Sequence, residues 1–136
     1  MNSEIVQLEK KRLPLLWKAV GAGRSIDHLL DVVEPDEELR AICPGNVPAP
    51  DGSSATNYMI AATDRRLIVV RLGALGGAAA HCSTPYGELG SFEVERDKKN
   101  RAKLVVRGPE VDLRLEKLPD GQLADLERAV AQRRAA

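Results

Sequence analysis

The spacing of apolar residues changes once along this chain, and that change restricts the fold more than any other feature. Up to Pro35 apolar residues recur every three or four positions, which is the spacing of an amphipathic helix. From Glu37 onward they alternate with polar residues, which is the spacing of a strand with one buried face. The sequence therefore predicts an N-terminal helical extension, residues 1–35, and a mainly β domain, residues 36–136, that ends in a helix.

The β domain is expected to contain seven short strands separated by turn-forming residues. Their expected ranges are 38–47, 57–63, 66–72, 80–86, 91–95, 103–107 and 111–116. The closing helix begins at Pro119, a residue that suits a helix start. Its inner apolar stripe is expected to consist of Leu123, Leu126 and Val130.

We expect these strands to form a seven-stranded antiparallel β-barrel, because an open sheet has edges and one bare end that an amphipathic helix can cap. A chain of 136 residues is long enough to give one such domain a substantial core. The barrel interior is expected to be filled by the side chains of Leu39, Ile60, Val70, Phe92, Leu104 and Leu113. A filled interior leaves no enclosed pocket, so we expect no small-molecule substrate.

The helical extension carries two clear apolar stripes. One is expected on a helix that begins near Pro14 and ends at Gly21, and the other on a helix capped by Ser25 and stopped by Pro35. Periodicity alone leaves open whether these helices pack on the β domain, which we favour, or bind a protein partner. The candidate partner-binding helix presents Leu13, Leu16, Trp17 and Val20.

Two segments rich in turn-forming or small residues are expected to project as loops from the β domain. Residues 44–56 contain prolines, glycines and serines, and residues 73–80 consist mainly of glycine and alanine. Turn formers interrupt the ladder between neighbouring strands. Since loops on a rigid scaffold often carry binding residues, both segments are candidate recognition loops.

The sequence shows no catalytic or metal-binding spacing. Cys43 and Cys82 form no CxxC pair, and His28 and His81 stand at no nucleophile or metal-ligand spacing. The glycine-rich segment 72–80 lacks the lysine and serine of a phosphate-binding loop. We therefore expect a protein that is not an enzyme and that binds no cofactor and no metal ion.

The charge balance of the chain restricts its partners. Lys and Arg number 20, Asp and Glu also number 20, and aromatic residues make up 3% of the chain, which disfavours nucleic-acid binding. Charged residues interrupt the N-terminal region where a signal peptide needs an apolar stretch. Nowhere does an apolar run reach the roughly 18 residues that a membrane-spanning helix requires. We expect a soluble, cytoplasmic protein that binds no nucleic acid.

Residues 62–68, with a predicted strand on each side of the turn, resemble the T-D-x-R-L-I hairpin of bacterial pleckstrin-homology-like domains, in particular the YokE-like group. The matching residues are Thr63, Asp64, Arg66, Leu67 and Ile68. The resemblance covers about residues 36–134 and departs from the family pattern at Ala62 and at Glu88-Leu89. It implies a pleckstrin-homology-like barrel that serves as a non-enzymatic binding or scaffold domain.

The hairpin motif is interpreted as structural. Asp64 and Thr63 can accept hydrogen bonds from backbone N–H groups of their own turn, and the stem of Arg66 can cover apolar surface. Phosphoinositide-binding pleckstrin domains are similar to one another in placing lysines and arginines on their first two strands, whereas residues 41–64 of this chain contain neither. We therefore favour a protein partner or self-association over a lipid ligand.

A basic cluster leaves one alternative function open. The hairpin between the fifth and sixth strands is expected to present Lys98, Lys99, Arg101 and Lys103 near its tip. Close to an anionic bilayer each such charge contributes about 1 kcal/mol of attraction. Peripheral binding to anionic membrane lipid through this tip is the alternative to protein binding.

Overall fold

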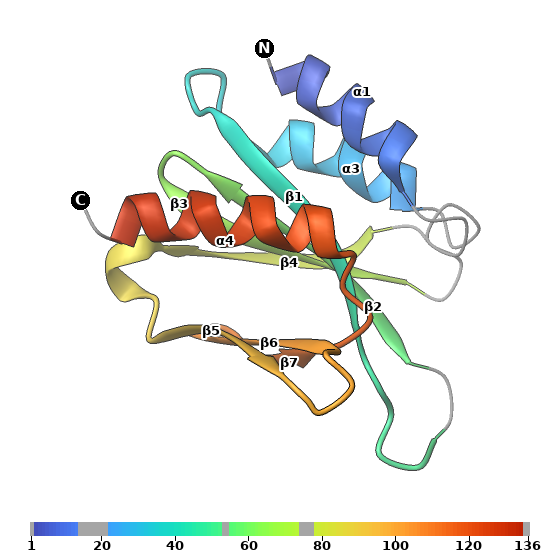
Figure 1. The fold of residues 1–136 in the computed structure, drawn as a ribbon. Helices are drawn as coiled ribbons and strands as arrows, with labels where there is room; N and C mark the ends of the chain where they lie inside the picture. The colour runs from blue at the N-terminus through green and yellow to red at the C-terminus, as the bar shows by residue number, and fades with distance from the viewer. Residues whose placement is uncertain (1, 14–21, 53–54, 74–77, 135–136) are drawn as a thin grey trace.

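In the part of the chain that the structure describes, seven strands form two antiparallel sheets that face each other, with helices on their outer side and at one edge (Figure 1). The computed structural model describes residues 2–13, 22–52, 55–73 and 78–134. The first sheet has the order β1 (Leu39–Val47), β2 (Thr56–Thr63), β3 (Arg66–Leu72) and β4 (Ala78–Pro85). The second has the order β5 (Ser91–Arg96), β6 (Ala102–Arg107) and β7 (Asp112–Leu115). Each predicted strand is present, with ends within one or two residues of those expected.

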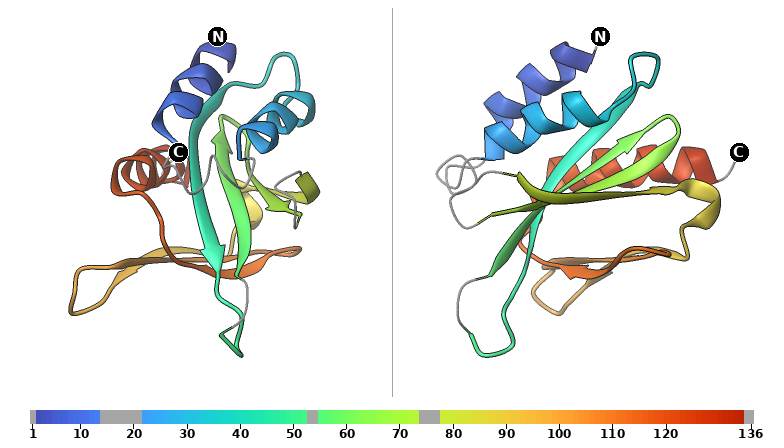
Figure 2. Two further views of the ribbon diagram at one scale, coloured as in Figure 1. Left: turned by 90° about the vertical axis from the view of Figure 1, so that its right-hand side faces the viewer. Right: turned by 180° about the vertical axis from the view of Figure 1, so that it is seen from behind.

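The predicted closed barrel is wrong, because the described residues form a β-sandwich whose sheets remain separate (Figure 2). The chain leaves the first sheet at the end of β4, passes through the short 3-10 helix η1 (Tyr86–Glu88) and enters the second sheet at β5. The sheets are linked by an isolated pair, Asn46 and Glu116, whose N–H groups donate to each other's carbonyl oxygens at 2.9 and 2.7 Å. Closure would need a continuous ladder around the whole sheet.

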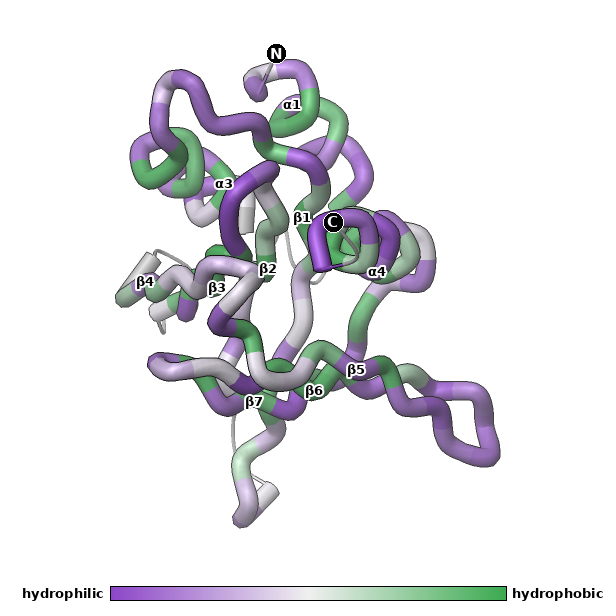
Figure 3. The backbone as a smooth tube through the Cα atoms, turned by 90° about the vertical axis from the view of Figure 1, so that its left-hand side faces the viewer, coloured by the Kyte–Doolittle hydropathy of each residue, from purple (hydrophilic) through white to green (hydrophobic). Residues whose placement is uncertain are grey.

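The closing helix α4 (Asp120–Arg134) lies beside β1 and above β5 (Figure 3). Its predicted inner stripe is confirmed, since Leu123 and Leu126 are 0% exposed and Val130 is 1% exposed. These side chains belong to the core between the two sheets. Within the described residues no helix is long and apolar enough to span a membrane.

The core between the sheets contains part of the interior predicted from the sequence. Ile60 and Leu104 are fully buried there, and Phe92 and Leu113 are partly buried against it. These four residues come from both sheets, so their packing holds the two layers together. Burying each large apolar side chain contributes about 1.5–3 kcal/mol.

Leu39 and Val70, expected in the same interior, lie on the opposite face of the first sheet. A register shift in the β1–β2 ladder separates Leu39 from Ala41, so the two side chains face opposite sides. Val70 belongs to a run of β3 residues that are all buried. Such a run has no alternation from which its inner face can be chosen.

Two N-terminal helices cover this outer face: α1 (Asn2–Arg12) and α3 (Ala22–Val32) (Figures 1 and 2). Val6 of α1 and Ile26 and Leu29 of α3 pack there against Ile42, Met59, Ala61, Ile68 and Val70. The first sheet is therefore buried on both faces. For α3 this packing on the β domain is the arrangement that we favoured from the sequence, whereas the helix expected over residues 14–21 lies outside the described residues.

The N-terminal helices differ from the prediction at the start of α3, and part of the predicted stripe is not described. Helix α3 begins at Ala22, so Ser25 lies inside the helix and does not cap it as expected. Of the predicted partner-binding stripe, Leu13 is buried at 5% exposure. Leu16, Trp17 and Val20 lie outside the described residues.

The first predicted loop is shorter than expected. Strand β1 continues through Pro44 and Gly45 to Val47, which pairs with Thr56. The prediction that these turn formers break the ladder is wrong because β1 is an edge strand of its sheet, where a residue without an N–H group is tolerated. The second predicted loop is also shortened, because β4 begins at Ala78.

Candidate functional site

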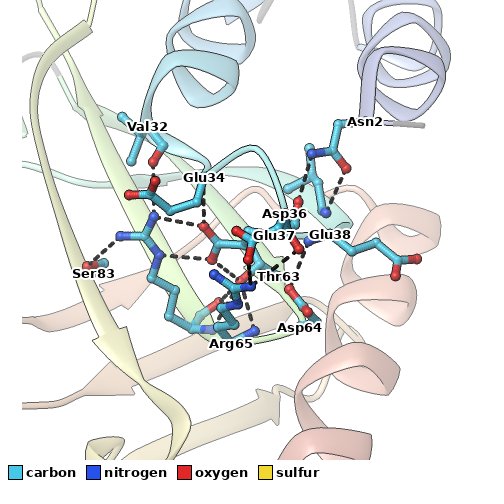
Figure 4. Close-up of polar contacts among 12 residues, drawn as sticks. Asn2, Val32, Glu34, Asp36, Glu37, Glu38, Thr63, Asp64, Arg65 and Ser83 are labelled. Carbon is cyan, nitrogen blue, oxygen red and sulfur yellow. Dashed lines mark hydrogen bonds and ion pairs between the residues drawn. The ribbon is translucent and has the colours of Figure 1, made fainter.

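The hairpin motif between β2 and β3 lies in a polar cluster that reaches several elements (Figure 4). Thr63 Oγ1 accepts hydrogen bonds from the backbone N–H groups of Arg65 and Arg66, at 3.1 and 3.0 Å. Asp64 was expected to accept bonds within its own turn, but its Oδ1 accepts the N–H of Glu38 at 2.8 Å. Asp64 therefore fixes the hairpin to the start of β1. The remaining motif residues, Leu67 and Ile68, are buried in β3.

Arg66 and Glu37 form an ion pair at the centre of this cluster. Arg66 Nε and Nη2 donate to the two carboxylate oxygens of Glu37, each at 2.9 Å, and Glu37 is 2% exposed. Arg66 also donates to the carbonyl oxygen of Val32 in α3 at 3.0 Å and to Ser83 Oγ in β4 at 3.2 Å. The side chain of Arg66 thus connects a helix to two strands, a role that the sequence did not indicate.

The ionisation of Glu37 follows from its hydrogen bonds. Burial alone would raise the pKa of this carboxyl, but hydrogen bonds from Arg66, Thr63 and the backbone of Glu34 outweigh it and lower the pKa from 4.5 to about 2. The hydrogen bond to Glu37 in turn raises the pKa of Arg66. Both groups are therefore charged at neutral pH. These contacts support the structural interpretation of the motif, since its polar groups are directed at neighbouring elements.

The cysteine thiols are not activated as nucleophiles. Burial raises the pKa of the Cys43 thiol well above its usual range and also raises that of Cys82. Because the thiolate is the nucleophilic form, both side chains stay protonated and weakly reactive near neutral pH.

A cleft opens on one side of the sandwich, between β5 and α4. Its volume is about 430 Å³. Four of its lining side chains are apolar, and α4 also contributes one acidic and one basic side chain. The lining residues are Phe92, Val94, Glu127, Val130, Ala131 and Arg134.

Strand β5, which borders this cleft, is an edge strand. In the described part of the chain β5 has a ladder partner on one side only, β6, so it is an edge strand of the second sheet. An edge strand presents backbone N–H and C=O groups that can pair with a further strand. The cleft therefore combines a backbone edge with an apolar wall.

Sequence reasoning missed this cleft although it identified its parts. The alternation of Phe92 and Val94 and the inner stripe residue Val130 were both predicted to face a core. That they line an opening depends on the failure of the barrel to close. The sequence signal that could have found it is the segment 85–90, whose turn formers separate β4 from β5.

A second hollow of about 310 Å³ lies between the first sheet and β7. Tyr58, Val69, Cys82, Val111 and Leu113 are its apolar lining residues, and Arg71, Glu110 and Asp112 are charged lining residues. His81 also adjoins the hollow, but its ladder partner Val70 places its side chain on the opposite face of the sheet. Charged side chains of both signs therefore line this hollow. Among the described residues, no hydrogen bond joins these side chains into a catalytic arrangement.

The basic cluster is only partly available for an anionic surface. Lys98 and Lys99 are exposed at the tip of the β5–β6 hairpin, which projects from the sandwich (Figure 3). Arg101 Nε contacts Asp97 Oδ2 at 2.8 Å, and Lys103 Nζ lies 4.0 Å from Glu116 Oε1. Two of the four predicted charges therefore have acidic neighbours that reduce the positive potential.

Comparison with known proteins identifies the fold. No protein-family model matches the chain, and no curated protein matches its sequence. Among solved structures, the pleckstrin homology domain from Shewanella amazonensis aligns with a TM-score of 0.51 and 18% identity, over 82% of this chain and 86% of the other. The C-terminal domain of an unknown protein from Leishmania infantum aligns with a TM-score of 0.52 and 17% identity, over 78% of this chain and 98% of the other.

Identities this low show a shared fold and no more. The fold agrees with the resemblance carried by the hairpin motif, with the barrel replaced by an open sandwich. The chain therefore has the fold of a bacterial pleckstrin-homology-like domain.

Proposed function

We propose that this protein is a non-enzymatic binding module that takes up an extended peptide segment of a protein partner as an added strand on β5, beneath α4. The observation that carries the proposal is the coincidence of an edge strand with an apolar cleft of about 430 Å³. Strand addition obtains affinity from backbone hydrogen bonds and specificity from alternate side chains. The cleft supplies a place for those side chains.

The lining indicates which peptide would fit. Phe92, Val94 and Val130 favour apolar anchor side chains, which contribute most when they fill a pocket. Glu127 and Arg134 stand on α4 at the same cleft, two helical turns apart. A peptide with an apolar anchor flanked by charges of both signs matches this surface better than a polyanion does.

The proposal is tested by narrowing the cleft without disturbing the core. Ala131 is exposed on α4 and lines the cleft, so Ala131→Trp should fill it. Gln132→Trp is the matched control, because Gln132 is the next exposed residue of the helix and lies outside the lining. The probe is a peptide selected on the wild-type protein from a random-sequence display library.

The expected result is a loss of peptide affinity of at least about 10-fold in Ala131→Trp, measured by fluorescence polarisation, with Gln132→Trp unchanged. Amide NMR shifts caused by the peptide should be concentrated on β5. The proposal is rejected if the library gives no binder or if the selected peptides bind Ala131→Trp as they bind the wild type. Light scattering of the wild type and Ala131→Trp shows whether the bound segment comes from a second copy of this chain.

A further inference from the structure

The structure brings the two histidines of the chain together at the junction of α3 and β4. His28 Nε2 lies 3.3 Å from His81 Nδ1, although the residues are 53 positions apart in the sequence. The ring centroids are 5.2 Å apart and the ring planes are tilted by 57°. No sequence motif indicates this contact.

The fold determines why the rings meet. His81 pairs with Val70 across the β3–β4 ladder, and Val70 belongs to the core beneath the N-terminal helices. Residues paired across a ladder share one face of the sheet, so His81 lies on the face that α3 covers. His28 is next to Leu29, which is buried against the same face, and is itself half-buried. His81 is exposed, so solvent ions can reach the pair.

The separation of the two nitrogen atoms fits two ligands of one tetrahedral metal ion. With zinc–nitrogen bonds of about 2.0–2.1 Å and a tetrahedral angle, two ligand nitrogens lie about 3.3 Å apart, whereas a right angle would give about 2.9 Å. The observed separation is 3.3 Å. An N–H···N hydrogen bond of that length would be at the long end of the normal range.

The ring positions agree with the same geometry. If each nitrogen lone pair points at a shared tetrahedral ion, the ring centroids should be separated by about 5.3 Å. If the rings instead lay in line along a straight hydrogen bond of the observed length, the centroids would be about 5.6 Å apart. The centroids are 5.2 Å apart, close to the shared-ion value, and a bent N–H···N hydrogen bond would bring the tilted rings equally close.

We propose that His28 and His81 form a binding site for one zinc ion, which links α3 to β4. Imidazole nitrogen is a preferred ligand of zinc. No group of three or more His, Cys, Asp or Glu side chains converges within the described residues, so solvent would complete the coordination. The ion would join the helical layer to the sheet edge, because its two protein ligands come from α3 and β4.

The experiment is a Zn²⁺ titration of the intact protein by calorimetry, together with thermal unfolding in the presence and absence of Zn²⁺. Because the chain has 2 histidines, the variants His28→Ala and His81→Ala test the pair completely. Cys82→Ser is the matched control: Cys82 adjoins His81 but packs on the opposite, inter-sheet face of β4. Circular dichroism shows that each variant is folded, and Mg²⁺ controls for a general effect of divalent charge.

The expected result is one Zn²⁺ bound per chain, with affinity reduced by about 100-fold or more in each histidine variant, because two joined ligands bind far better than one. Zn²⁺ should raise the unfolding temperature of the wild type and of Cys82→Ser, but not of either histidine variant. Binding that is undetectable at about 1 mM Zn²⁺ overturns the proposal. Loss of Zn²⁺ binding in only one of the two histidine variants, or in Cys82→Ser, overturns the proposal as well. Neither outcome depends on the β5 cleft.

Discussion

At the scale of single residues, the ion pair of Arg66 and Glu37 connects the N-terminal helices to the β domain. A buried carboxylate is costly to desolvate unless its oxygen atoms are hydrogen-bonded. Here those atoms accept bonds from Arg66, from Thr63 Oγ1 at 2.6 Å and from the backbone N–H of Glu34 at 3.0 Å. Removing one partner leaves the other groups buried without compensation.

We therefore expect Glu37→Gln to lower the free energy of unfolding by about 2–4 kcal/mol, as measured by urea denaturation. The matched control is Asp36→Asn, which removes a carboxylate paired with Arg65 at 2.7 Å in an exposed position. That change should have little effect, because exposed pairs are screened by solvent. Equal effects of the two substitutions would contradict the role given to Glu37.

The same residue should make stability depend on pH. The pKa of Glu37 is about 2 in the folded protein and 4.5 when the carboxyl makes none of these contacts, as in the unfolded chain. The unfolded state therefore takes up the proton first as the pH falls. The stabilisation is then complete above pH 4.5 and is lost as the pH decreases toward 2. We expect the difference in unfolding free energy between the wild type and Glu37→Gln to shrink over this range. A constant difference would show that Glu37 is not the titrating group.

At the scale of elements, α1 and α3 act as the outer cover of the first sheet. Asn2 of α1 accepts the N–H of Leu39 at 2.9 Å and donates to the carbonyl oxygen of Glu37 at 3.0 Å. Gln122 of α4 donates to Glu9 of α1 at 2.6 Å, and both side chains are buried. The helical extension is thus joined to the strands and to the closing helix by polar contacts as well as by its apolar face.

Two adjacent leucines of α3 test this packing. Leu29 is 0% exposed in the outer core, whereas Leu30 is 37% exposed. We expect Leu29→Ala to lower the free energy of unfolding by about 2–5 kcal/mol, because it removes apolar contacts and leaves a cavity. Leu30→Ala should change it by much less. Similar values for both variants, measured by chemical denaturation, would contradict the packing of α3 on the sheet.

At the scale of the whole molecule, the open sandwich separates its candidate sites. The cleft lies between β5 and α4, the histidine pair lies between α3 and β4, and the basic tip lies at the end of the β5–β6 hairpin. Each can be altered without changing the others. The hairpin tip carries the membrane alternative, and its exposed lysines are Lys98 and Lys99, while the exposed Arg101 is paired with Asp97.

Two exposed lysines would supply about 2 kcal/mol of attraction to an anionic bilayer, which is too little for stable binding on its own. We therefore expect the wild type not to pellet with phosphatidylserine vesicles at physiological salt. The charge-reversed variant Lys98→Glu/Lys99→Glu and the control variant Lys11→Glu, outside the hairpin, should behave alike. Pelleting that the double variant abolishes and the control retains would instead support the membrane alternative.

The sequence predicted the strands and the closing helix because their apolar spacing is a local property. The alternation in β5 and β7 and the stripe of α4 each depend on residues a few positions apart, and the structure confirms them. In β6 the alternation is incomplete, because Val105 is buried as well as Leu104 and Val106. The T-D-x-R-L-I resemblance implied the fold, which the solved structures of similar fold support. In β3, where side chains on both faces of the strand are buried, the local spacing did not indicate which residues face the second sheet.

Only the tertiary structure decided that the sheets stay open, that Leu39 faces the helices and that Arg66 reaches Glu37, Val32 and Ser83. It also brought His28 to His81 and Phe92 to Val130. Each of these contacts joins residues from different elements whose relative placement depends on how the sheets stack and where the ladder breaks. The sequence by itself determined the strands and the closing helix, since those follow from short-range periodicity and turn chemistry, while the family of fold was implied by the resemblance of the hairpin. The sites arise from long-range packing, which periodicity does not encode.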